Sequence, residues 1–100
     1  MSITVNILYS GEGSSAQDFA QEMLDSGTVS KIRAEAGNLR YAYFQPLDDP
    51  QSILLIDEWT DEAAIELHHK SDMMTRIAEL RQKYHLRMKV TRYQEMEKEK

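Results

Sequence analysis

Three residues near the middle of the chain could together carry acid–base and aromatic chemistry: Asp57, Trp59 and His68. A neutral imidazole accepts protons near pH 7, so His68 is the candidate general base. Asp57 and Trp59 are two positions apart in a predicted strand, and such residues project from the same face. We expect the carboxylate to orient His68 and raise its basicity, and the indole to form a flat wall for an aromatic ligand.

Each of the three residues also has an ordinary structural interpretation, which the sequence leaves open. His68 can be a partly buried helix histidine, Asp57 can cap the helix that follows its strand, and Trp59 can anchor the core or an interface. His69 points about 100° away from His68 on a helix and is expected in solvent. Adjacent histidines lack the i, i+4 spacing of helical zinc ligands, so no metal site is expected here.

The elements that must position these residues follow from the apolar pattern. Strand composition or alternation occurs in four segments, residues 3–9, 39–45, 52–59 and 86–93. Helical spacing occupies residues 16–36, with an interruption near 26–28, then residues 60–70, and then a segment that begins at 71–72. The order β-α-β-β-α-β predicts a ferredoxin-like α+β fold, with helices on one face of a four-stranded antiparallel sheet.

The second and third predicted strands are apolar on both faces. Leu54 and Ile56 lie on one face of residues 52–59, and Ile53 and Leu55 lie on the other. One layer of helices covers only one face, so a monomer would expose a large apolar patch. Sheet-on-sheet packing in an isologous homodimer is therefore expected, and a marginal monomer with a poorly protected sheet is the alternative.

Length and composition exclude several classes of protein. One hundred residues make a single domain, expected over residues 1–95 with a charged tail at 96–100. The net charge of −5 argues against nucleic acid or an anionic membrane as a partner. The chain has no cysteine, which excludes thiolate chemistry. With no signal-peptide pattern and no apolar run of about 20 residues, a cytoplasmic protein is the default expectation.

Residues 33–71 resemble the antibiotic biosynthesis monooxygenase domain family, a family of dimeric α+β barrels. The resemblance is carried by the runs AEAGNLRY (34–41), DDP (48–50), LLIDEW (54–59) and DEAA (61–64), followed by His68 and then Lys70-Ser71. Order and spacing fit over most of the chain. The resemblance implies a homodimer whose sheets form a barrel, and a small-molecule pocket between each sheet and its own helices.

The resemblance also implies a chemistry and a set of site residues. Some members of the family oxidise quinols or polycyclic phenols with molecular oxygen and no cofactor. His68 stands at the family's helix histidine position and would take the phenolic proton, and Asp57 stands where glutamate is usual. In the family, asparagine on this strand can face the pocket and polarise a substrate oxygen, so Asn6 either does so or lies on the wetter face of the sheet. Three residues of one strand, Arg40, Tyr41 and Tyr43, either add substrate contacts or serve as packing residues.

Family membership alone does not fix function. The same His/Asp pair could serve an isomerase or detoxification enzyme for a small carbonyl compound. A non-catalytic dimeric module that binds an aromatic or haem-like ligand is a further alternative. Haem degradation is less well supported, because those relatives carry an iron-ligating histidine on the helix that here starts at Ser71-Asp72, and no histidine follows before His85.

Overall fold

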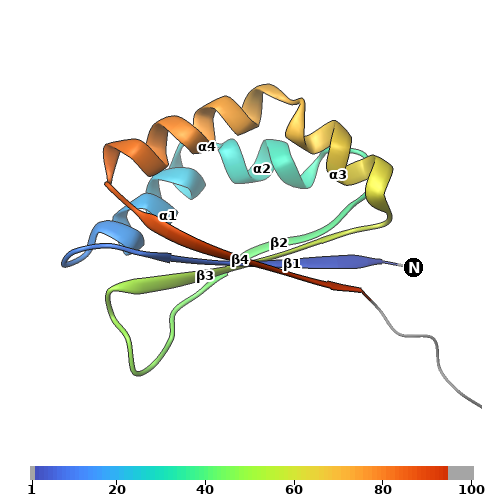
Figure 1. The fold of residues 1–100 in the computed structure, drawn as a ribbon. Helices are drawn as coiled ribbons and strands as arrows, with labels where there is room; N and C mark the ends of the chain where they lie inside the picture. Colours follow the sequence, from blue (N-terminus) through green and yellow to red (C-terminus); the bar gives the residue numbers. More distant parts are fainter. Residues whose placement is uncertain (1, 95–100) are drawn as a thin grey trace, which may run out of the picture.

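A computed structural model describes residues 2–94 of the chain and gives a four-stranded sheet with helices on one face (Figure 1). In chain order the elements are β1 (Ile3–Ser10), α1 (Ser15–Asp25), α2 (Thr28–Arg33), β2 (Asn38–Phe44), β3 (Ser52–Trp59), α3 (Glu62–His69), α4 (Asp72–Lys83) and β4 (Arg87–Gln94). The strand order is β2-β3-β1-β4, and every neighbouring pair is antiparallel. The ferredoxin-like prediction is confirmed, and the predicted tail at residues 96–100 lies outside the described residues.

The long helical segment predicted over residues 16–36 divides into α1 and α2. The chain turns at Gly27, whose φ of 80° lies in the left-handed region that glycine adopts without strain. The second helical segment divides as expected near residue 71. Asp61 caps α3 by accepting a hydrogen bond from the backbone N–H of Ala64 at 2.9 Å, and the Ser71 hydroxyl donates to the carbonyl oxygen of His68 at 2.7 Å.

The core lies between the helix layer and the facing side of the sheet. One face of α1 is buried along the length of the helix, at Ala16, Phe19, Ala20 and Met23. These side chains pack with sheet residues, and the rings of Tyr9 and Phe19 lie 4.8 Å apart. Full burial of one large apolar side chain contributes about 1.5–3 kcal/mol, so such contacts dominate the stability of this small domain.

The turn before β2 packs directly against the start of α3. Gly37 has a φ of 82°, and a Cβ atom at this position would lie 2.4 Å from Ala64 Cβ. The carbonyl oxygen of Gly37 accepts a hydrogen bond from the backbone N–H of Thr60 at 2.9 Å. This close approach holds residues 34–37 beside α3.

The strand register assigns side chains to the two faces of the sheet. Val5 pairs with Asp57 on the helix-covered face, whereas Asn6 pairs with Ile56 on the opposite, outer face. The middle of this outer face is apolar, with Leu8, Ala42, Phe44, Leu54 and Ile56. The sequence prediction that strands two and three are apolar on both faces is therefore confirmed.

Candidate active site

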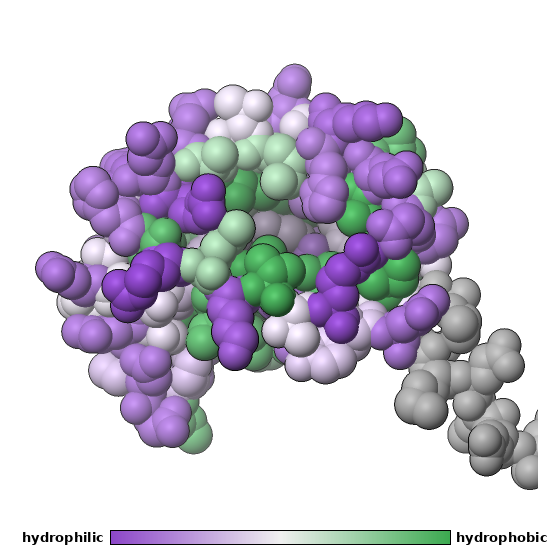
Figure 2. Space-filling model, viewed as in Figure 1, coloured by the Kyte–Doolittle hydropathy of each residue, from purple (hydrophilic) through white to green (hydrophobic). Residues whose placement is uncertain are grey.

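A cavity of about 340 Å³ lies between the sheet and helices α3 and α4. Figure 2 shows a hollow between the helix layer and the sheet, bordered by green hydrophobic side chains and strongly hydrophilic ones. The apolar lining includes Ile7, Leu55, Ile65, Met74 and Ile77. Cavities that hold small molecules span about 300–1,000 Å³, so this one has room for a small aromatic compound.

His68 lines this cavity from the last turn of α3 and is 6% exposed. Its Nδ1 lies 2.6 Å from Glu35 Oε1. A carboxylate only accepts hydrogen bonds, so it selects the imidazole tautomer with the proton on Nδ1 and leaves Nε2 as a proton acceptor. The ring also stacks on Trp59, with centroids 4.6 Å apart and planes 29° apart. Two contacts therefore fix the imidazole.

The carboxylate that orients His68 is Glu35, which corrects the expectation for Asp57. Glu35 precedes Gly37 in the turn that packs against α3, and this packing brings it to a histidine 33 positions away in sequence. Asp57 is instead hydrogen-bonded by the indole N–H of Trp59, with Nε1 2.7 Å from Oδ2. Asp57 and Trp59 thus project from the same face of β3, as predicted. The Asp57 carboxylate, however, binds the Trp59 indole and not the His68 imidazole.

Asp57 lines the cavity as a buried carboxyl with one oxygen unused. It is 5% exposed, and Oδ1 has no hydrogen-bond partner among the residues that the structure describes. Burial raises the pKa of Asp57 from 3.8 to about 6, and the Trp59 hydrogen bond and the nearby His68 oppose the rise. A carboxyl with such a pKa can exchange protons near neutral pH, which is typical of functional sites.

The aromatic residues differ in how they meet the cavity. Trp59 and Tyr41 line it, and the Tyr41 ring lies 6.4 Å from the His68 ring. Tyr43 lies behind Tyr41, edge-on to it at 6.0 Å, and packs on Phe19 at 6.3 Å. Burial raises the pKa of both tyrosines, so their hydroxyls stay protonated near neutral pH. Of the two predicted tyrosine contacts, Tyr41 is the one placed to touch a ligand.

Asn6 and Arg40 do not line this cavity, so their placement does not favour the ligand-contact interpretation of either residue. Val5 and Ile7 line it, so Asn6 between them points to the outer face. Arg40 also belongs to the outer face, where its guanidinium lies 5.1 Å from the centre of the Phe44 ring. Asn6 could contact a ligand in this cavity only if its side chain projected from the other face of β1.

Charged residues that the sequence interpretation did not select also meet the cavity. Arg81 approaches from α4, Arg92 from β4, and the exposed His69 from α3. Arg92 donates to Glu62 Oε2 at 2.6 Å. The spacing of Met74, Ile77, Ala78 and Arg81 is i, i+3, i+4, i+7, so Arg81 ends the helix face that lines the cavity. That spacing was the available signal for Arg81.

Two further properties concern residues 2–94 only. This region holds no group of three or more histidine, aspartate or glutamate side chains arranged to hold a metal ion. None of its helices is long and apolar enough to cross a membrane.

Comparisons with known proteins identify the family. The family model for antibiotic biosynthesis monooxygenase matches residues 2–80. YcnE, a candidate monooxygenase of Bacillus subtilis, is 33% identical over 43 residues, which span 43% of this chain and less than half of YcnE, 45%.

Solved structures share the fold at low sequence identity. A candidate antibiotic biosynthesis monooxygenase from Deinococcus radiodurans has a TM-score of 0.81 at 22% identity, covering 100% of this chain and 97% of its own. SnoaB, a cofactor-independent oxygenase from Streptomyces nogalater, has a TM-score of 0.78 at 14% identity, covering 97% of this chain and 95% of its own. With the family model spanning most of its length, the chain belongs to the antibiotic biosynthesis monooxygenase family.

Proposed function

We propose that this protein is a cofactor-independent monooxygenase that oxidises a quinol-like or phenolic small molecule with molecular oxygen. The observation that carries the proposal is the Glu35–His68 pair, with Nδ1 2.6 Å from Oε1, on the wall of a mostly apolar cavity. Membership of the family supports the reaction class, and the fold shared with the oxygenase SnoaB is consistent with it.

In this proposal His68 is the general base. Nε2 removes the proton from a substrate hydroxyl, and Glu35 stabilises the resulting imidazolium through Nδ1. The electron-rich anion gives one electron to oxygen, and the two radicals combine to form a peroxide at a ring carbon. The imidazolium returns its proton to the peroxide. Loss of the proton on that carbon then breaks the O–O bond and leaves a carbonyl, and the distal oxygen departs as hydroxide, which takes up that proton to become water. The net reaction converts CH₂ and O₂, or the corresponding phenol tautomer and O₂, to C=O and H₂O.

Asp57 is proposed as the second proton acceptor. With a pKa of about 6 it is mostly ionised near neutral pH, and its unpartnered Oδ1 can accept the proton from the peroxide-bearing carbon. Trp59 holds the other oxygen in place and forms the flat wall for the substrate ring, with Tyr41 beside it. Asn6, Arg40 and Tyr43 have no direct role in this scheme, because none of them lines the cavity.

We also propose that two copies assemble through their outer sheet faces. The middle of that face is apolar and favours a partner with an equally apolar surface. The same sheet face of a second copy is such a surface, related by two-fold symmetry. The apolar residues are Leu8, Ala42, Phe44, Leu54 and Ile56. Light scattering at micromolar concentration should give twice the monomer mass. A monomer would contradict this assembly and would leave the reaction proposal untouched.

The direct test is oxygen uptake by metal-stripped protein with a panel of quinols and anthrone-like phenols. We expect His68→Ala to lower the rate by about 10²–10⁴-fold, the usual contribution of a general base. His85→Asn is the matched control, since His85 is exposed and has a positive φ of 53° that asparagine tolerates. Uptake at the uncatalysed rate in the wild-type protein, with a quinol demonstrably bound, would refute the proposal.

One observation also favours a proton-transfer enzyme that needs no oxygen. His68 and the raised-pKa carboxyl of Asp57 line one cavity, and such a pair can move a proton between two carbons of a carbonyl compound. Turnover of a carbonyl compound under strict anaerobiosis would establish this alternative. Ligand binding with no turnover in either atmosphere would instead indicate a binding module.

A further inference from the structure

One face of α4 forms a wall of the cavity and ends in a positive charge. Met74, Ile77 and Ala78 supply apolar or small surface, and Arg81 follows at the next position of the same face. Arg81 is only partly exposed. Burying a guanidinium among apolar side chains costs free energy unless an anion compensates it.

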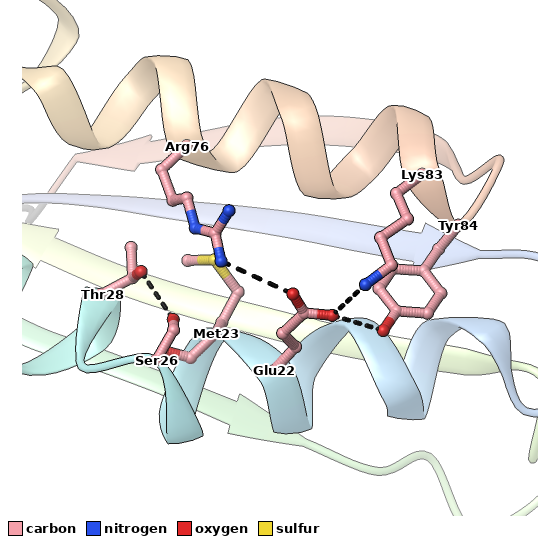
Figure 3. A network of polar contacts seen from close by, with 7 residues as sticks. All are labelled: Glu22, Met23, Ser26, Thr28, Arg76, Lys83 and Tyr84. Atoms are coloured by element: carbon pink, nitrogen blue, oxygen red, sulfur yellow. Dashed lines mark hydrogen bonds and ion pairs between the residues drawn. The ribbon is translucent and has the colours of Figure 1, made fainter.

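The other basic groups of α4 already have a carboxylate. Figure 3 shows Glu22 reaching from α1 to α4, where Oε1 accepts hydrogen bonds from Lys83 Nζ at 2.8 Å and from the Tyr84 hydroxyl at 2.5 Å. Arg76 lies 3.5 Å from Oε2 of the same side chain. Glu22 is thus engaged on the side of α4 that faces α1, and Arg81 takes no part in this cluster.

Two other basic side chains at the cavity have carboxylate partners. His68 has Glu35, and Arg92 has Glu62. Within residues 2–94, no carboxylate forms an ion pair with Arg81. Arg81 is therefore the guanidinium of this cavity that remains available to a ligand.

Arg81 and the proposed proton-transfer groups reach the cavity from different elements. Arg81 comes from the last turn of α4, whereas His68 comes from the last turn of α3 and Asp57 from β3. The cavity wall thus carries a cationic group on α4 and proton-accepting groups on α3 and β3.

We propose that the substrate is an aromatic hydroxy acid whose carboxylate binds Arg81 while its hydroxyl faces His68. The inference rests on the proposed function, because it concerns the same cavity. Guanidinium groups match planar carboxylates with two parallel hydrogen bonds. The apolar side chains that line the cavity accommodate the ring, so one planar molecule of this kind meets both Arg81 and His68. A neutral quinol would leave Arg81 without a partner.

The test is binding of 2-naphthoic acid and of its uncharged amide at pH 7.5 under argon. Quenching of Trp59 fluorescence reports binding, because Trp59 lines the cavity and is the one tryptophan of the sequence. We expect the acid to bind wild-type protein about tenfold more tightly than the amide, which corresponds to about 1.4 kcal/mol. Arg81→Gln should bring this ratio near one without changing the affinity for the amide, and Arg81→Lys should keep part of the preference.

Arg76→Gln is the matched control, since it removes the same charge from the same helix on the side that faces α1. It should leave the acid-to-amide ratio unchanged. Equal affinity for the two ligands in the wild-type protein would overturn the proposal, as would no binding of either at millimolar concentration. A preference that survives Arg81→Gln, or that Arg76→Gln abolishes equally, would overturn the assignment to Arg81.

The outcome is separable from that of the oxygen-uptake test, because no oxidation occurs under argon. A preserved acid preference without oxygen uptake by any aromatic hydroxy acid would remove the monooxygenase and retain the carboxylate site. Oxygen uptake that depends on His68 but shows no preference for acids would retain the monooxygenase and remove the carboxylate site. If Arg81→Gln slows neutral and acidic substrates equally and leaves binding unchanged, Arg81 acts on the reacting oxygens and the carboxylate proposal is wrong.

Discussion

The two halves of the helix layer cover the same sheet but are built differently. On the α1 and α2 side, Phe19, Met23 and Ile32 are fully buried, at 0% exposure. On the α3 and α4 side, the helices leave a cavity, and Met74 and Arg81 on its wall are partly exposed. The first half supplies close packing, whereas the second gives up packing to make space. The comparison indicates that close packing and open space are concentrated in different helix pairs of this domain.

The largest effect should come from opening the closely packed half. Phe19→Ala removes a fully buried ring that contacts Tyr9 and Tyr43, and we expect a loss of about 3–5 kcal/mol in the free energy of unfolding. Met74→Ala in the cavity wall should cost only about 1–2 kcal/mol, because part of that side chain already borders space. Urea denaturation of both variants measures the difference. Equal losses would contradict the division between the two halves.

The next effect is the free energy that the buried carboxyl of Asp57 costs on the side of the sheet covered by α3 and α4. The folded chain keeps the Asp57 proton up to about pH 6, whereas an unfolded chain releases it near 3.8. Folded protein therefore binds more protons between these values, so the stability from Asp57 is present below pH 3.8 and is lost as the pH rises through 6. The shift corresponds to about 3 kcal/mol at most.

Asp57→Asn removes this dependence. Relative to wild-type protein, the variant should gain stability by up to about 3 kcal/mol between pH 4 and pH 7.5, measured by urea denaturation at each pH. Asparagine can still accept the Trp59 hydrogen bond, so the fold is retained. Asp48→Asn, an exposed loop position, is the control and should show no such trend. A constant difference across the pH range would mean that Asp57 has an ordinary pKa.

A smaller effect is expected at the carboxylate that orients the imidazole. Glu35→Gln keeps an oxygen that can accept the Nδ1 proton but loses the charge that stabilises the imidazolium. We expect the oxygen-uptake rate to fall by about 10–100-fold, the usual effect of a residue that orients a functional histidine, with little change in substrate affinity. An unchanged rate of oxygen uptake would assign Glu35 a purely structural role.

The sequence predicted the fold well because its determinants are local. The strand at residues 86–93, the helical spacing that begins at residue 16 and the break near residue 71 each depend on neighbours within a few positions, and the corresponding elements are present. The site was less predictable because it depends on contacts between distant segments. Glu35 reaches His68 through the packing of Gly37 on Ala64, which no spacing along the chain reveals.

The remaining differences between prediction and structure concern which face of the sheet each strand residue projects from. Asp57, Trp59 and Tyr41 were assigned to the side that proved to hold the cavity, but the assignment of Asn6 needed the register between β1 and β3. Apolar residues on both sides of β1 gave no indication of which side the helices cover. Arg81 is a different case. Its spacing from Ile77 and Ala78 places it on the same helix face, but a polar residue is not part of an apolar pattern.

The contact between Gly37 and Ala64 has a mechanical consequence. A Cβ atom on residue 37 would lie 2.4 Å from Ala64 Cβ, so the turn that carries Glu35 and the helix that carries His68 fit together without intervening space. The backbone hydrogen bond from Thr60 to Gly37 also ties the turn to the residues just before α3. We therefore expect Glu35 and His68 to move as one body whenever α3 shifts, so that their 2.6 Å contact is kept.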